Sequence, residues 1–297
     1  MIVWLASYPR SGNTLLRTIL RRCFGLCSME DVRIDRPGEM RDNPDMIGHL
    51  EKEESWEEFY QKASTSNELF LVKTHLPPRD EAPFIYVVRD GRLSVKSYRK
   101  FHRDYNGIDK SIASLIVGDD DFGDWTTHYK VWNDRPGPER LLLRFEELVD
   151  VAMEDLKRIA GFIGYTGEIT PWQNPIGQFR EVEPNFFNRA DTRFSADSCW
   201  GPAERFLFEQ FHGELMRSLG YEEDLSCNFF LNQIPVEFRT MAEVMVPLLR
   251  RLAAENHEKT AVIHDLDRRL KAVTAQGDKR QFAMRYLFKR FARAIYR

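Results

Sequence analysis

A glycine-containing turn near the N-terminus carries the residue types of an anion-binding site. Residues 7–14 read Ser-Tyr-Pro-Arg-Ser-Gly-Asn-Thr and lie between an apolar run and a segment with helical spacing. At such a junction, free backbone N–H groups and the positive end of a helix point at one spot. Gly12 lets the backbone approach a ligand closely, and Arg10 offers a forked cation to phosphate oxygens. The uncharged hydrogen-bond donors of the turn are Ser11, Asn13 and Thr14.

This turn differs from the Walker A loop of ATP- and GTP-binding proteins. A Walker A loop has a lysine directly after its second glycine, whereas Asn13 follows Gly12 here. No aspartate suited to holding Mg²⁺ is evident at the end of a following strand. We therefore expect a phosphate site that requires no metal.

Charged and titratable side chains also follow two later apolar runs. Lys73 and His75 come after residues 69–72, and Arg89 follows residues 84–88, with Ser97 eight residues further on. Open α/β sheets bind ligands at the carboxyl ends of their strands, so these groups are predicted to border the same crevice as the turn. A histidine titrates near neutrality and therefore suits proton transfer.

The elements that must position these groups are strands and helices in alternation. Continuous apolar runs predict buried parallel strands at residues 2–6, 69–72, 84–88 and 141–143. Helical spacing predicts helices at residues 13–20, 92–101 and 152–163. We expect loops and short helices over 30–66 and a polar loop over 102–124. The alternation predicts an α/β fold, in which a central parallel sheet is flanked by helices in a P-loop-like three-layer sandwich.

The C-terminal quarter has a different character. We predict one domain over residues 1–225 and a C-terminal helical extension over 226–297. Apolar residues between 241 and 273 recur at coiled-coil spacing, which allows a homodimer. Residues 278–297 hold seven Lys or Arg and one Asp on a basic amphipathic pattern. Such a helix lies either on an anionic membrane surface or on the acidic body of the enzyme or a second subunit.

Composition narrows the class of protein. The chain has 297 residues, 42% of them hydrophobic, and a net charge of −3, so we expect a sizeable core and no nucleic-acid partner. None of the four cysteines forms a C-x-x-C pair, and we expect them reduced. The sequence shows no transmembrane or signal-peptide pattern. These features predict a cytoplasmic protein, with peripheral contact at the inner membrane surface if its tail binds lipid.

Five segments in order resemble motifs of the PAPS-dependent sulfotransferases, where PAPS is 3′-phosphoadenosine 5′-phosphosulfate. Residues 7–14 resemble the family's 5′-phosphosulfate loop, and residues 72–77, Val-Lys-Thr-His-Leu-Pro, resemble its K-T-H-L-P segment. Residues 85–90 with Ser97 are similar to its 3′-phosphate motif. Residues 144–148 resemble its Y-E-D-L element, and residues 193–200 keep the spacing of its R-K-G-x-x-G-D-W motif.

The resemblance implies transfer of a sulfuryl group from PAPS to a hydroxyl acceptor, leaving the bisphosphate PAP. It implies His75 as the general base, with Lys73 and Arg10 as cations on the leaving group. The cofactor-binding residues that it implies are Arg10, Ser11, Gly12, Asn13 and Thr14 at the 5′ end and Arg89, Ser97 and Arg193 at the 3′ end. A transferred group with little charge can be stabilised by protein cations alone, so no metal is expected.

The sequence also departs from the family pattern. Leu15 stands where many members have a tryptophan that stacks on adenine, and Phe194-Ser195 replaces the late Lys-Gly pair. The alternatives are a P-loop-type nucleotide kinase or NTPase that needs Mg²⁺, and a non-catalytic nucleotide-binding scaffold. The acceptor class stays open among glycans, lipid-linked alcohols, small natural-product alcohols, phenols, steroids and peptides.

Overall fold

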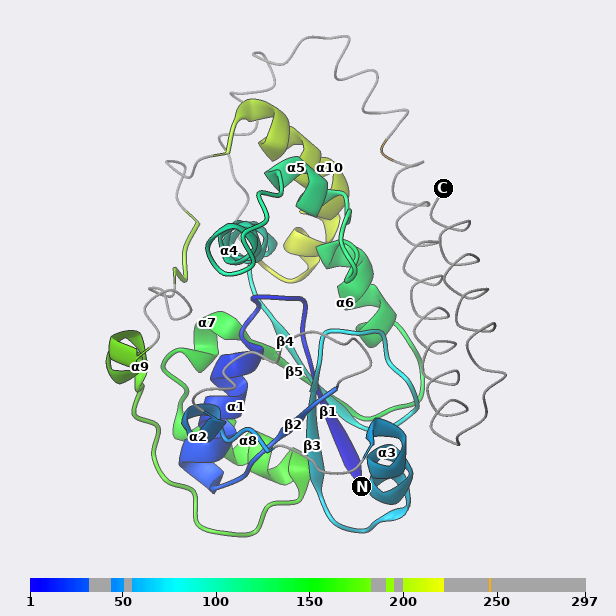
Figure 1. Ribbon diagram of the computed structural model, residues 1–297, viewed down its shortest axis with the longest axis vertical. Helices are drawn as coiled ribbons and strands as arrows, with labels where there is room; N and C mark the ends of the chain where they lie inside the picture. The colour runs from blue at the N-terminus through cyan, green and yellow to red at the C-terminus, as the bar shows by residue number, and fades with distance from the viewer. Residues whose placement is uncertain (32–43, 51–54, 183–190, 195–199, 222–245, 247–297) are drawn as a thin grey trace, which may run out of the picture.

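Five parallel strands form the centre of the protein in the computed structural model, which describes residues 1–31, 44–50, 55–182, 191–194, 200–221 and Val246 (Figure 1). In sheet order the strands are β2 (Met29–Glu30), β3 (Phe70–Thr74), β1 (Ile2–Ala6), β4 (Phe84–Val88) and β5 (Arg140–Arg144). Four of them confirm the predicted strands. The coiled-coil segment and the basic tail lie outside the described residues.

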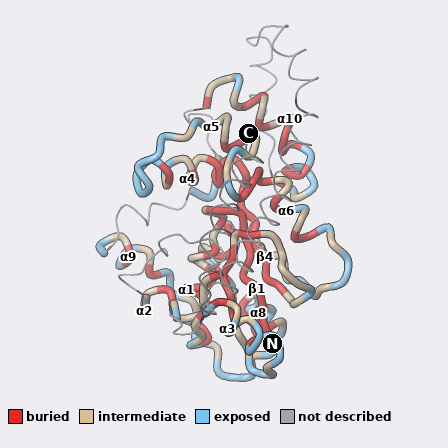
Figure 2. The backbone as a smooth tube through the Cα atoms, turned by 45° about the vertical axis from the view of Figure 1, so that its right-hand side comes forward, coloured by how far each residue is buried: buried red, intermediate tan, exposed pale blue. Residues whose placement is uncertain are grey.

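Helices cover both faces of the sheet, as predicted, because side chains alternate along each strand. From β1, Val3 and Leu5 pack against α1 (Asn13–Phe24) and α8 (Met153–Ile163). On the opposite face, Trp4 belongs to a second apolar cluster with α3 (Trp56–Thr65) and α6 (Trp125–Asn133). Figure 2 shows β1 and β4 buried along their whole length. The result is the expected three-layer α/β sandwich.

A group of helices lies beyond the carboxyl ends of the strands. It consists of α4 (Gly91–Asp104), α5 (Ile112–Ile116) and α10 (Pro202–Ser218), which contact one another (Figure 1). Further short helices are α2 (Pro44–Ile47), α7 (Phe145–Leu148) and α9 (Ile176–Val182).

The expectation of a polar loop over residues 102–124 is confirmed for 105–111 and 117–124 and is wrong for the remainder. Helix α4 continues to Asp104, and α5 buries Ile112, Leu115 and Ile116 against the core. A helix of five residues is too short for its apolar spacing to stand out from the polar residues around it.

The chain order of the strands creates one crevice. Strand β1 pairs with β3 on one side and with β4 on the other, so the connections leave β1 in opposite directions. Ligands of open α/β sheets bind at such a switch point, outside the carboxyl ends of the strands. The turn after β1, His75 after β3, Arg89 after β4 and Phe145 after β5 all lie at this edge.

No helix in the described ranges is long and apolar enough to cross a membrane. Cys23 and Cys27 both carry free thiols.

Candidate active site

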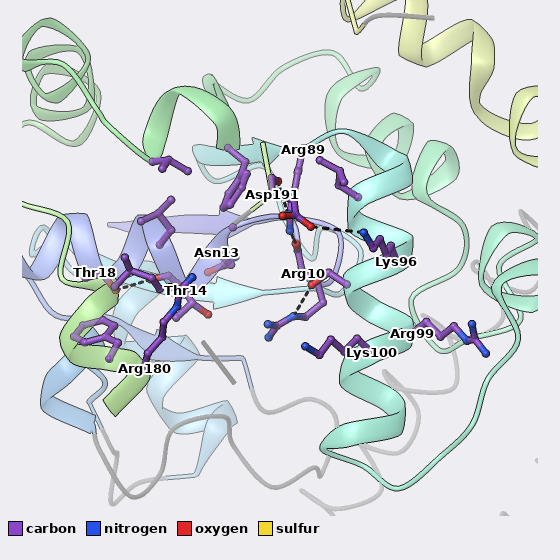
Figure 3. Close-up of a pocket in the computed structure, with 18 of the residues that line it drawn as sticks. Arg10, Asn13, Thr14, Thr18, Arg89, Lys96, Arg99, Lys100, Arg180 and Asp191 are labelled. Atoms are coloured by element: carbon purple, nitrogen blue, oxygen red, sulfur yellow. Dashed lines mark hydrogen bonds and ion pairs between the residues drawn. The ribbon is translucent and has the colours of Figure 1, made fainter. Parts of the chain in front are cut away.

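A cavity of about 830 Å³ opens at the carboxyl edge of the sheet (Figure 3). It is strongly basic, because among the described residues Asp191 is the only acidic one that lines it. The cations that line it are Arg10, Arg89, Lys96, Arg99, Lys100, Arg103 and Arg180. Of the residues predicted from sequence, the cavity lining brings together Arg10, Gly12, Asn13, Thr14, His75, Arg89 and Ser97.

The turn after β1 presents the start of α1 to the cavity. Gly12 is the N-cap residue, with a φ of 111° and no side-chain capping bond, and the first turn of α1 holds no acidic residue. The N–H groups of that turn are therefore available to an anion. Arg10 also has a positive φ, 62°, which is uncommon for a residue with a side chain and typical of ligand-binding turns.

Gly12→Ala is expected to destabilise the turn. A Cβ atom at Gly12 would lie 2.6 Å from Cδ2 of Phe145, and its φ of 111° disfavours any side chain. Strain and overpacking together predict a loss of at least about 2 kcal/mol in the free energy of unfolding, measured by urea titration. Gly25→Ala is the matched control, because Gly25 also has a positive φ but no atom within 4 Å of the added Cβ. Equal losses in the two variants would show that Phe145 does not restrict residue 12.

Two side chains of the turn brace it instead of facing the cavity. The Asn13 amide donates a 2.7 Å hydrogen bond to the carbonyl of Leu5, and the Ser11 hydroxyl lies 3.0 Å from that of Ser94 in α4. Both side chains are buried. At Asn13 the donor left for a ligand is therefore the backbone N–H, whereas the backbone N–H of Ser11 donates to the carbonyl of Tyr8 at 3.1 Å.

Arg10 and Arg89 join the turn to the end of β4. Arg89 donates from Nη1 to the carbonyl of Arg10 at 3.1 Å and from Nη2 to the carbonyl of Asp191 at 2.8 Å. Its buried Nε has no hydrogen-bond partner among the described residues. Burial lowers the pKa of Arg89 to about 10, so the group stays a cation at neutral pH. Its neighbour Asp90 pairs with Arg92 at 2.6 Å.

Arg10 reaches across the cavity to α4. Its Nε lies 3.5 Å from the hydroxyl of Ser97, and its guanidinium lies 5.1 Å from the ring centre of Phe101. Arg10, Arg89 and Ser97 therefore lie close together, although they come from three different elements.

His75 has a defined tautomer. Its Nδ1 lies 2.7 Å from the carbonyl oxygen of Ser7, which can only accept, so Nδ1 carries the proton and Nε2 keeps its lone pair. Helix α6 fixes the backbone here: His128 donates to the carbonyl of His75 at 2.9 Å, and Trp132 donates to that of Leu76 at 3.1 Å. The ring of Phe122 packs edge-on against the imidazole.

The imidazole of His75 is neutral. Burial, with the nearby charges of Lys73 and Arg10, lowers its pKa to about 3, and the bond to Ser7 and the charge of Glu30 oppose this only in part. Above this pH the ring is neutral, and its Nε2 is unprotonated.

The ammonium group of Lys73 does not line the cavity. It is buried and forms an ion pair with the carboxylate of Glu30, its register partner on β2. A role as a leaving-group cation would require Lys73 to leave Glu30.

Arg193 lies apart from the other predicted residues. It is exposed and does not line the cavity, whereas Asp191 does. Its neighbour Phe194 lies under the guanidinium of Arg92, 4.6 Å from the ring centre. Trp200 is a core residue, buried against Phe208 of α10.

Sequence reasoning missed most of the cations in this cavity. Lys96 and Lys100 lie four residues apart on the predicted helix 92–101, and this spacing was the signal that could have found them. Arg103 lies in the range that was expected to be a loop. Arg180, on α9, had no such signal. Within the described residues, no group of three or more His, Cys, Asp or Glu side chains could hold a metal ion.

Comparison with known proteins identifies the family. The model of the sulfotransferase domain matches residues 2–176, more than half of the chain. The chain belongs to the sulfotransferase family. Sulfotransferase 4A1 of mouse, rat and human is in each case 27% identical over 185 residues, which cover 54% of this chain. The match spans 59% of the length of these relatives.

A crystal structure of mouse sulfotransferase SULT7A1 complexed with PAP aligns over 73% of this chain and 84% of that chain, with 18% identity and a TM-score of 0.46. In this chain, the sulfotransferase domain contributes the sheet edge, the turn and α4 to the cavity. Helix α9, with Arg180, lies at or beyond the end of the matched region.

Proposed function

We propose that this protein transfers the sulfuryl group of PAPS to an acceptor hydroxyl, with His75 as the general base. The observation that carries the proposal is one cavity that combines two anion sites with a neutral imidazole. The first anion site is the start of α1 with Arg10, and the second is Arg89 with Ser97.

The residues present fit the two charged ends of PAPS. Backbone N–H groups at Gly12, Asn13 and Thr14 with the Arg10 guanidinium would hold the 5′-phosphosulfate. Arg89 has a buried Nε without a partner in the described chain, and a 3′-phosphate would satisfy it by a charge-assisted bond. Ser97 would add a hydroxyl donor.

An apolar wall on the same cavity would hold the adenine. Leu15, Val149, Ile176 and Phe179 line this part of the cavity. Phe179 is buried and packs with Ile47, so it forms the base of this apolar wall. This wall would take the part that a tryptophan at position 15 has in other members of the family.

In the proposed reaction, the acceptor oxygen forms a bond to sulfur as the bond from sulfur to the 5′-phosphate oxygen breaks in line. The proton of the acceptor hydroxyl passes to Nε2 of His75, and the electron pair stays on the 5′-phosphate of PAP. Arg10 and the N-terminus of α1 stabilise the charge that develops on that phosphate. Lys73 would contribute after its separation from Glu30.

The low pKa of His75 can be measured directly. An imidazole NMR titration of the unliganded protein should show no midpoint for His75 near 6.5, because its pKa is lowered to about 3. The neutral base is thus present throughout the range from pH 5 to 8, and it is lost only as the pH falls toward the lowered value. His75→Gln assigns the resonance, and a midpoint near 6.5 would contradict the burial of the imidazole beside Lys73 and Arg10.

The proposed function is tested by transfer of ³⁵S from labelled PAPS onto a native extract in the presence of EDTA. We expect labelled product and metal-independent turnover. Loss of activity in EDTA would favour a nucleotide kinase or NTPase, and PAP binding without transfer to any acceptor would favour a non-catalytic scaffold.

Four expectations from the sequence stay predictions. They are the domain boundary at residue 225, the membrane contact of residues 278–297, a homodimer and a cytoplasmic location.

A further inference from the structure

Helix α9 contributes one cation, Arg180, to the lining of the cavity. Its side chain is half-buried, and it forms no ion pair or hydrogen bond with any of the described residues. Neither phosphate of PAPS is assigned to it, because Arg10 and Arg89 would serve them. Since a partly buried cation gains free energy from a partner, we expect a ligand of the cavity to supply one.

Contacts at both ends hold α9 beside the apolar wall. Just before the helix, Asn174 donates from Nδ2 to the carbonyl of Val149 at 2.9 Å. Near its end, the ring centre of Phe179 lies 6.0 Å from the guanidinium of Arg22 in α1. Leu15, also in α1, packs in the same apolar cluster as Val149. The wall therefore spans α1, the segment after β5 and the start of α9.

Arg180 shares the cavity face of α9 with a member of this wall. Ile176 and Arg180 lie four residues apart, and both line the cavity. Long side chains on a helix lean toward its N-terminus, so Arg180 leans back over Ile176. In Figure 3 the side chain of Arg180 extends toward Thr14 and Thr18 of α1. The guanidinium thus faces the space between α9 and α1, next to the apolar wall.

We propose that Arg180 is an adenine-binding residue, whose guanidinium stacks on one face of the base while the wall at Leu15 packs against the other. The inference rests on the proposed function, because it assumes that the cavity binds PAPS. Leu15, Val149 and Ile176 offer aliphatic surface, whereas a guanidinium is planar, weakly hydrated and suited to stacking on aromatic rings. Arginine side chains stack on nucleic-acid bases in the same way.

The test compares PAP with ribose 3,5-bisphosphate, which lacks the base, by calorimetry on the full chain. The ratio of the two affinities measures what the base contributes, and the wild type should bind PAP at least about fivefold more tightly. In Arg180→Met this ratio should fall by about fivefold or more, with little change for ribose 3,5-bisphosphate. Arg180→Lys, which keeps the charge but not the plane, should lose most of the same ratio.

The matched control is Arg22→Met. Arg22 also contacts α9, at Phe179, but it does not line the cavity, so this variant should keep the wild-type ratio. An unchanged ratio in Arg180→Met, or full recovery of it in Arg180→Lys, overturns the inference alone. An equal loss for the two ligands would mean that Arg180 binds a phosphate, and this also overturns the inference. Failure of the wild type to bind PAP at all overturns the proposed function itself.

Discussion

His75→Ala is expected to abolish most sulfuryl transfer while leaving PAP bound. A positioned general base contributes about 10²–10⁴ in rate, so turnover of labelled PAPS should fall by that factor. The affinity for PAP should change little, because both proposed phosphate sites lie on other residues. Nε2 is the nitrogen that would accept the proton, because Nδ1 donates its hydrogen to the carbonyl of Ser7.

Two measurements separate this loss from a structural effect. The variant loses the bond to Ser7, so its thermal unfolding and its PAP affinity are measured together with turnover. His75→Gln, which can still donate to the Ser7 carbonyl, should be equally inactive because an amide is no base. Near-normal turnover in either variant would remove His75 from the base role.

Arg89→Met is expected to abolish the ability to distinguish PAP from AMP, which lacks the 3′-phosphate. Charge-assisted hydrogen bonds contribute about 1.5–3 kcal/mol each, so the wild type should bind PAP at least about tenfold more tightly than AMP. The substitution should bring the two affinities close together. It also removes the bond to the carbonyl of Arg10, so AMP binding should weaken as well. The informative quantity is therefore the ratio of the affinity for PAP to the affinity for AMP.

Arg158→Met is the control for this experiment, because Arg158 is an exposed arginine on α8. The control should keep the wild-type ratio, as measured by calorimetry with each nucleotide. An Arg89 variant that still prefers PAP by the full factor would mean that the 3′-phosphate lies elsewhere in the cavity.

The sequence predicted the strands and the shared crevice correctly, because there the local apolar pattern and the topology of a parallel sheet agree. The strands at residues 2–6 and 84–88 were predicted with the bounds that the structure shows, because each is a fully buried apolar run. The carboxyl ends of parallel strands meet at one edge, so placing Gly12, His75 and Arg89 after strands also predicted that they would share a crevice. The structure places all three in one cavity lining.

The sequence did not predict contacts that depend on the pairing of segments far apart in the chain. Strand β2 has only two residues, so nothing local predicted that Glu30 would lie opposite Lys73 and pair with it. The same holds for Arg180 and Asp191, which reach the cavity from distant segments without any periodic signal. Arg193 was chosen from spacing alone, and the structure places it on the surface, outside the cavity lining.

A crystal structure of the full chain grown with PAP tests the central claim most directly. We predict the 5′-phosphate at the N–H groups of residues 12–14 with Arg10, and the 3′-phosphate at Arg89 and Ser97. Nε2 of His75 should face the 5′-phosphate across a space for the acceptor oxygen. PAP bound away from the turn, or with its two phosphates exchanged between these sites, would contradict the proposed chemistry.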